Sequence, residues 1–326
     1  MKKVLSLILA LAMVFALAAC GEKQPSNDGN TDGDKPARGN VIMTFGTADT
    51  GGSMYPAGAA VSQVWTNNVQ GVKCNTQTST GSFQNCQDVS TGEVDVAVAT
   101  SDVVLNAYNG TGKFADIGKL DNLRVIGAVY TSVLSGVTLK SSGLTYIHDL
   151  LGKRVAVGPA ASATENATLA AFGVMGIDSS NTSLENLGLG DGILDAAFGF
   201  AGLPIGGQLN LAATKEIQVL DMTQEEIDKV LAGNAAYIQT KIPAGTYTGQ
   251  DNDANTFGVK CLIIVTADMD ADLVYDLCKA MNEHTEEMAA GNALLKDMTD
   301  PSFLCTQMPI PLHDGAQKYY SEQGLI

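Results

Sequence analysis

Apolar residues between positions 41 and 326 occur in short runs that alternate with segments of helical period. The runs are rich in Val, Ile, Ala and Phe, and they predict strands at 41–45, 94–98, 123–130, 135–139, 154–157, 195–200 and 261–265. Elsewhere apolar residues recur every three or four positions, which predicts helices at 57–69, 165–172 and 270–288. Thr223 and Glu226 have the spacing of a capping box, which predicts another helix start. The alternation of strands and helices predicts parallel sheets covered on both faces.

Two stretches interrupt this alternation and predict how the chain divides. The pattern changes at 135–150, and the segment 242–256 is rich in Gly, Pro, Asn and Asp. If the chain crosses between two lobes at both places, lobe 1 contains 41–135 and 250–326, and lobe 2 contains 136–249. The predicted fold class is α/β with two lobes, each a mostly parallel sheet flanked by helices. The ligand would then bind in the cleft between the lobes, beyond the carboxyl ends of the strands.

The first 40 residues have a different composition and predict export. Two lysines precede an apolar run of about 16 residues, which fits a signal peptide at 1–19 and is short for a membrane span. The run ends in Leu17-Ala18-Ala19-Cys20-Gly21, which resembles a bacterial lipobox with Cys20 as the lipidated residue. An ordinary cleavage site beside an incidental cysteine is the alternative. Residues 20–40 contain no large apolar side chain and predict a flexible linker. The sequence thus predicts an extracytoplasmic lipoprotein anchored to the cell membrane.

Charge and cysteine spacing exclude several classes of partner. The formal net charge is −16, so we expect no binding to nucleic acid. No cysteine pair has C-x-x-C spacing, so neither a zinc site nor a thioredoxin-type site is predicted, and no cofactor is expected. Cys74 and Cys86 are either a disulfide between a strand and the next helix or packed free thiols.

Catalytic motifs are absent from the sequence. The three histidines, His148, His284 and His313, do not form H-E-x-x-H, and neither a G-x-S-x-G elbow nor a G-x-x-x-x-G-K-[ST] loop is present. We expect His148 and His313 to be surface or capping residues. Aromatic residues make up only 6% of the chain, with a single tryptophan, which is poor for a sugar-binding platform. The sequence therefore favours a binding protein over an enzyme.

Glycine-rich turns between strands and helices are the strongest local signals for a binding site. In the first turn, 47–56, Gly51 and Gly52 allow close backbone approach, and Ser53 is placed to cap the following helix. A second turn, 158–165, carries a capping box of Ser162 and Glu165, and a third lies at 79–82. Free N–H groups at such helix starts attract anions, so two facing starts would clamp a small zwitterion or dicarboxylate. Each turn is also a common structural feature.

These segments resemble the TAXI family of solute receptors for TRAP-type transporters, and the resemblance covers nearly all of 41–326. The matching segments, in order, are FGTADTGGSMYPAG (45–58), TGSFQN (80–85), GEVDVAVATSDVVLNAYNGTG (92–112), LRVIGAVY (123–130), DLLGKRVAVGPAASATE (149–165), LDAAFGFAGLP (194–204), IPAGTYTGQ (242–250) and MPIPLHDGAQKYY (308–320). The resemblance implies a two-lobed periplasmic-binding-protein-like fold of type II. It implies capture of a small carboxylate or amino acid, glutamate- or glutamine-like, and delivery to the membrane subunits of a TRAP permease.

The ligand-facing positions of the family, carried over by motif, are Gly52, Ser53, Met54, Tyr55, Gly81, Ser82, Ser101, Asp102, Tyr130, Ser162, Thr164, Ala201, Gly202 and Pro204. The sequence departs from the family at Gly199, Gly206 and Gly207, which bears on the solute's identity. The three arginines are Arg38, Arg124 and Arg154, none of them expected at the cleft, so amides and hydroxyls would hold a carboxylate. We expect hinge closure at 131–137 and 252–260. A ligand-binding sensor or chemoreceptor partner on the same fold is the alternative function.

Overall fold

The computed structural model describes residues 39–326, apart from 49, 51, 161 and 188–193. Cys20, the predicted signal peptide, nearly all of the predicted linker and Gly51 lie outside the described residues. The described residues form one compact unit.

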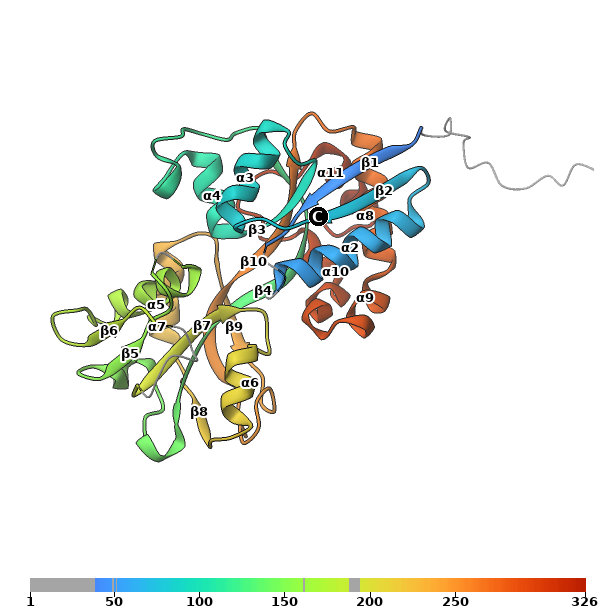
Figure 1. The fold of residues 1–326 in the computed structure, drawn as a ribbon. Helices are drawn as coiled ribbons and strands as arrows, with labels where there is room; N and C mark the ends of the chain where they lie inside the picture. The colour runs from blue at the N-terminus through green and yellow to red at the C-terminus, as the bar shows by residue number, and fades with distance from the viewer. Residues whose placement is uncertain (1–38, 49, 51, 161, 188–193) are drawn as a thin grey trace, which may run out of the picture. The chain divides into compact units, whose positions relative to one another are not determined.

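The described strands form a mixed sheet in the order β2-β1-β3-β10-β4-β7-β5-β6, with β8 paired to β4 and β9 paired to β10. The strands are β1 (Val41–Gly46), β2 (Val72–Gln77), β3 (Val96–Thr100), β4 (Leu123–Leu139), β5 (Arg154–Ala156), β6 (Ser183–Glu185), β7 (Ala196–Ala201), β8 (Ile217–Val219), β9 (Tyr237–Ile242) and β10 (Ala254–Thr266). β2-β1-β3 and β6-β5-β7 pair in parallel, whereas β4 and β10 pair antiparallel with each other and with their other neighbours. Helices lie on both faces of the sheet (Figure 1).

The helices have the following bounds: α2 (Met54–Asn68), α3 (Ser82–Thr91), α4 (Ser101–Asn109), α5 (Ala163–Val174), α6 (Gly206–Ala212), α7 (Gln224–Gly233), α8 (Ala271–Glu283), α9 (Thr285–Gly291), α10 (Pro301–Cys305) and α11 (Asp314–Glu322). The shorter 3-10 helices are η1 (Gly112–Phe114), η2 (Lys140–Ser142), η3 (Ile147–Leu150) and η4 (Ala293–Thr299). Both bonds of the capping box predicted at Thr223 and Glu226 are present at the start of α7. No helix in the described part of the chain is long and apolar enough to span a membrane.

β4 corrects one prediction from the sequence. The pattern predicts separate extended pieces at 123–130 and 135–139, but the structure has one continuous strand through both. The polar residues between them, Thr131 and Ser132, are buried, and their backbones pair with β10. Hydrogen bonding to a neighbouring strand therefore continues the strand where the apolar pattern breaks. β10 likewise begins earlier than the predicted strand at 261–265.

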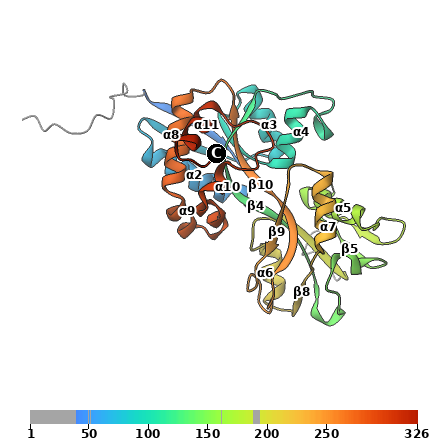
Figure 2. The same ribbon diagram turned by 180° about the vertical axis from the view of Figure 1, so that it is seen from behind.

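Hydrophobic cores lie at both ends of these two long strands. One core combines residues before position 131 with residues after 260, and Trp65 Nε1 in α2 donates to the Leu277 carbonyl of α8 at 3.0 Å. Another core is built from residues between 134 and 259. Figures 1 and 2 show α2, α8 and α11 at one end of β4 and β10, and α5, α6 and α7 at the other. This arrangement is consistent with lobe 1 and lobe 2 as defined above; their exact boundaries stay a prediction.

The cysteines of the described part are buried free thiols, at positions 74, 86, 261, 278 and 305. Cys74 and Cys86 therefore do not form the disulfide that the sequence left open, and the packed-thiol alternative holds.

Candidate functional site

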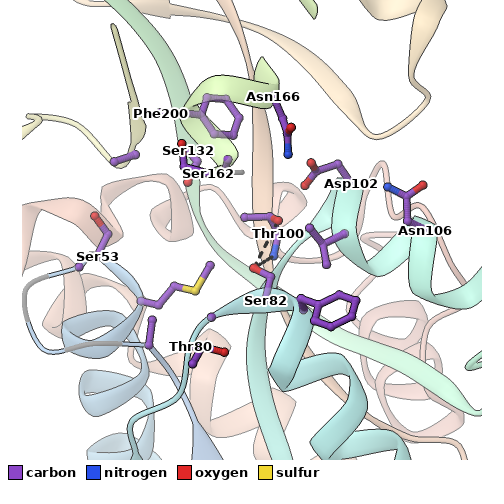
Figure 3. Close-up of a pocket in the computed structure, with 18 of the residues that line it drawn as sticks. Ser53, Thr80, Ser82, Thr100, Asp102, Asn106, Ser132, Ser162, Asn166 and Phe200 are labelled. Carbon is purple, nitrogen blue, oxygen red and sulfur yellow. Dashed lines mark hydrogen bonds between the residues drawn. The ribbon is translucent and has the colours of Figure 1, made fainter. Parts of the chain in front are cut away.

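A cavity of about 770 Å³ lies against the middle of β4 and is lined by residues from both ends of the sheet. Lobe 1 supplies residues at and just before the starts of α2, α3 and α4 and from η1, and lobe 2 supplies the start of α5 and the end of β7. Between them, Tyr130 and Ser132 of β4 form the floor. In Figure 3, Phe200, Ser162 and Asn166 lie on the side opposite Ser53, Thr80 and Ser82. The cavity therefore lies between the two lobes.

Four helices begin at this cavity. Their N-cap residues, Ser53 for α2, Gly81 for α3, Thr100 for α4 and Ser162 for α5, all line it. Among the described residues, no N-cap side chain accepts from a backbone N–H in the first turn of α2, α3 or α4, whereas Ser162 Oγ accepts from Glu165 N at 3.1 Å. Backbone N–H groups at helix starts carry partial positive charge. The convergence of these starts makes the cavity suited to a small anionic group.

The predicted capping role of Ser53 is wrong. Ser53 precedes α2, but its backbone is already helical, with φ −71° and ψ −26°. A capping side chain needs an extended backbone to fold back over the N–H groups of the next turn. Ser53 instead presents its hydroxyl at the cavity, as Figure 3 shows.

Asp102 is the negatively charged residue among those that line the cavity. It lies in the first turn of α4, and its Oδ1 atom is buried without a hydrogen-bond partner among the described residues. Burial raises the pKa of Asp102, although bonds to Thr100 and to backbone amides oppose the shift. Figure 3 shows its carboxylate facing Asn166 of α5 across the cavity. A buried carboxylate oxygen without a donor is costly, so this position favours a ligand group that donates hydrogen bonds and carries positive charge.

Polar contacts hold the start of α3 against the strands behind it. Asn85 Nδ2 donates to the carbonyls of Thr47 and Val98, both at 2.6 Å. Ser82 Oγ accepts from Thr100 N at 3.0 Å, which joins the starts of α3 and α4. These bonds fix two helix starts relative to each other, so the binding groups are positioned before a ligand arrives.

Tyr130 forms part of the floor and is only 2% exposed. Burial raises its pKa well above the usual value, so the phenol stays neutral and keeps its proton. The Oγ atom of Ser132, two residues along the strand, lies 3.4 Å from Cys261 Sγ on β10.

The structure brings nine of the predicted ligand positions to the cavity: Gly52, Ser53, Met54, Gly81, Ser82, Asp102, Tyr130, Ser162 and Ala201. Five others lie elsewhere. Tyr55 is half-buried in the first turn of α2 outside the cavity lining, and Thr164 packs against Gly158. Ser101 is buried and donates to the Ala236 carbonyl at 3.1 Å. Gly202 packs against Leu294, and Pro204 lines a second, smaller cavity. That any of these residues binds a ligand stays a prediction.

Thirteen other lining residues are not among the predicted ligand positions: Ala48, Thr80, Phe83, Thr100, Val103, Asn106, Gly112, Lys113, Phe114, Ser132, Ala163, Asn166 and Phe200. Ala48, Thr80 and Ala163 lie within the glycine-rich turns that the sequence singles out, and the other ten lie outside them. Two of them carried a usable signal. Asn106 and Asn166 follow Asp102 and Ser162 by four residues, so each lies on the same helix face as a predicted site residue. Phe83 and Phe114, whose ring centroids are 4.6 Å apart, are joined only by tertiary packing.

The histidines have structural roles away from the cavity. His313 Nδ1 accepts from Gly315 N at 3.2 Å and caps α11, which confirms the capping prediction for that residue. His148 Nδ1 lies 2.8 Å from Glu226 Oε1. The described residues contain no group of three or more His, Cys, Asp or Glu side chains that could hold a metal ion.

The fold and the interlobe cavity define a class, that of type II periplasmic-binding-protein-like folds. The chain belongs to the NMT1-like family, whose model matches residues 45–324. A TctC solute-binding protein from Polaromonas, solved without ligand, is 13% identical with a TM-score of 0.54, and the match covers 90% of this chain and all of that one. The alkanesulfonate-binding protein SsuA from Xanthomonas axonopodis pv. citri, bound to MOPS, is 13% identical with a TM-score of 0.48 over 87% of this chain and 85% of that one.

Proposed function

We propose that this protein is an extracytoplasmic solute receptor of a TRAP-type secondary transporter, in the TAXI subfamily. It captures a small carboxylate or amino acid, glutamate- or glutamine-like, and delivers it to the membrane subunits of the permease. The observation that carries the proposal is the convergence of four helix starts on one interlobe cavity. Membership of the NMT1-like family and the fold shared with a TctC solute-binding protein support it.

Asp102, which lines the cavity together with the cation Lys113, favours a zwitterion over a dicarboxylate. The helix starts at Ser53, Gly81 and Ser162 suit the solute's carboxylate, and Asp102 Oδ1 suits its ammonium group. Arg124 does not take part, because its Nη1 donates to the carbonyls of Asp121 and Leu123. A second carboxylate beside Asp102 would bring two like charges together in a poorly solvated place.

Capture proceeds by hinge closure. The lobes are joined where β4 and β10 run antiparallel, with Val133 opposite Gly258, within the predicted hinge segments. A solute that touches both lobes stabilises the closed form only by the contacts it gains on closure. The permease then recognises the closed shape.

The predicted signal peptide and the lipid on Cys20 complete this proposal. Cys20 would tether the receptor to the outer face of the cell membrane, and residues 20–40 would let the folded unit reach the permease. The sequence charge of −16 gives nucleic acid no role in this proposal.

A thermal-shift screen of the full chain tests the binding function. The probes are L-glutamate, L-glutamine, other amino acids, succinate and glutarate. A solute present at about 100 times its Kd stabilises the folded state by about 2.7 kcal/mol. For a chain of this size the melting temperature should therefore rise by roughly 5 °C or more.

A matched pair of variants shows whether the shift comes from the cavity. Ser53→Trp fills the cavity at the start of α2 and should abolish the shift while the unliganded melting temperature is kept. Gln63→Trp adds the same side chain at an exposed position of the same helix and should bind as the wild type does. If no probe raises the melting temperature, the assigned solute class is wrong. If Ser53→Trp binds normally, the α2 start is not part of the site.

A further inference from the structure

A second cavity, of about 250 Å³, lies on the opposite face of the hinge. On β4, Tyr130 and Ser132 line the interlobe cavity, whereas Thr131 and Val133 line this second one. Side chains alternate between the two faces of a strand, so the two cavities lie on either side of β4. The end of β7 and the segment that follows it also contribute residues to both cavities. Ala201 lines the interlobe cavity and Pro204 lines the second. We call this second cavity the hinge groove.

One wall of the hinge groove belongs to lobe 1 and is fixed to the hinge strand. It is formed by η4, from Ala293 to Asp297. Asp297 Oδ2 accepts from Thr131 N at 3.1 Å and from Thr131 Oγ1 at 2.8 Å. These bonds tie η4 to the lobe 1 end of β4.

The other wall belongs to lobe 2 and is formed by Leu203, Pro204 and the segment from Thr240 to Thr246. Its two parts are joined by a buried hydrogen bond from Ile205 N to the Tyr247 hydroxyl at 3.0 Å. This bond ties the two parts of the lobe 2 wall together.

The two walls touch at Gly202 and Leu294. A methyl group added to Gly202 would lie 1.9 Å from Leu294 Cδ1, so the Leu294 side chain packs directly on the Gly202 backbone. Leu294 belongs to η4 and Gly202 follows β7, so this contact joins the lobes on the face away from the solute.

We propose that the hinge groove sets the balance between the open and closed forms of the receptor, an inference that rests on the hinge closure proposed above. Rotation about β4 and β10 that narrows the interlobe cavity must widen the groove behind it. A bulky group in the groove therefore favours the closed form. Loss of the Leu294 contact also favours the closed form, because that contact is made only while the groove is narrow. Either change raises solute affinity without touching the solute.

Distances between spin labels on the two lobes test this directly. The labels go on Asn109→Cys in α4 and Leu169→Cys in α5, both exposed and outside the lining of either cavity. The full chain carries Cys20→Ser so that its thiol does not react, and the remaining cysteines are buried. In the absence of solute, Ala293→Trp and Leu294→Ala should each raise the ratio of short to long distances by about fivefold or more.

Ala290→Trp is the matched control. It adds the same side chain at an exposed alanine of α9, outside the groove, and should leave the distances unchanged. If Ala293→Trp behaves like this control, or lengthens the distances, the role of the groove is wrong. The melting temperature of each variant confirms that it is folded.

A further measurement separates this inference from the proposed function. The wild type is measured with L-glutamate and with L-glutamine. If solute shortens the distance between the labels in the wild type, but Ala293→Trp does not shorten it without solute, the proposed role of the groove is wrong and the receptor function is still supported. If Ala293→Trp shortens the distance between the labels without solute, the proposed role of the groove is supported even if neither amino acid binds. If neither change occurs although the amino acid raises the melting temperature, hinge closure is wrong and both proposals fail.

Discussion

At the residue scale, Asp102 is the acidic side chain among the described residues that line the interlobe cavity. Its carboxylate is held in the first turn of α4, its Oδ1 has no partner among the described residues, and burial raises its pKa. A carboxyl whose pKa is higher in the folded chain binds its proton more tightly there than in the unfolded chain. The charged form therefore lowers stability, as expected for a group that serves a ligand rather than the fold.

We predict that Asp102→Asn stabilises the solute-free protein at neutral pH. The wild type should lose stability relative to the variant as pH rises from about 3.8 through the raised pKa of Asp102. Denaturant unfolding of both proteins between pH 3.5 and 7 measures this. Asp116→Asn, which removes an exposed acid of the same lobe, is the control. A stability difference between Asp102→Asn and wild type that is independent of pH would contradict the account.

The same variant should also change which solutes bind. Without the carboxylate, an ammonium group loses its partner, and we expect amino acids to bind at least about tenfold more weakly. Glutarate, which has no ammonium group, should bind no more weakly than before. Isothermal titration calorimetry on the two proteins gives both affinities. A loss of glutarate binding equal to the loss of amino acid binding would place Asp102 in a structural role.

The residues that the sequence could and could not reveal differ in how they reach the cavity. Ser82, Asp102 and Ser162 lie at turns between strands and helices, where local signals are strong. Phe83 and Phe114 meet only because η1 packs back on α3, and no local pattern records that contact. A contact of this kind, made only by tertiary packing, cannot be predicted from local sequence.

Lys260 shows, at the scale of elements, how the C-terminal segment is attached to the hinge. It lies opposite Thr131 across the pair β4–β10 and is 2% exposed. Its Nζ donates to the carbonyls of Phe303 at 2.8 Å and Thr306 at 3.0 Å, at the end of α10. Burial lowers its pKa to about 8, against the opposing effect of nearby acidic groups.

We predict that Lys260→Met destabilises the protein by about 3 kcal/mol, because two buried carbonyls lose their donor. The loss should depend on pH. Between about pH 8 and 10.5 the unfolded chain holds the lysine proton more tightly, so the wild type gains stability relative to Lys260→Met as pH rises. Denaturant unfolding at pH 7.5 and 10 gives both numbers. Lys279→Met, at an exposed position of α8, is the control. A stability difference that falls with pH would contradict the assigned burial.

Two elements whose length the sequence misjudged are the long strands β4 and β10. The local pattern predicts strands of ordinary length, whereas β4 and β10 continue through polar residues such as Thr131 and Thr256. Thr256 Oγ1 donates to the Leu134 carbonyl at 2.8 Å, so its polar group is satisfied within the sheet. The local pattern ends a predicted strand at a polar residue because the hydrogen-bond partner of that residue cannot be seen in the nearby sequence. Here the partner, Leu134, is more than 100 positions from Thr256.

The whole molecule is proposed to be tethered at Cys20, and this can be tested chemically. We predict that the full chain, expressed in a bacterium, incorporates labelled palmitate and that Cys20→Ala abolishes the incorporation. Cys74→Ala should retain it, because Cys74 is a buried thiol of the folded unit. Label that persists on Cys20→Ala would show that the lipid is attached elsewhere. Absence of label on the wild type would exclude a lipid anchor.

The central claim is that a solute bridges the two lobes and closes the molecule around itself. The most direct measurement is the distance between spin labels at Asn109→Cys and Leu169→Cys, taken with and without the amino acid that gives the largest thermal shift. We predict that a saturating solute converts the distribution to the shorter distance, and that Ser53→Trp prevents the change. A solute that binds tightly and leaves the distance distribution unchanged would contradict the account.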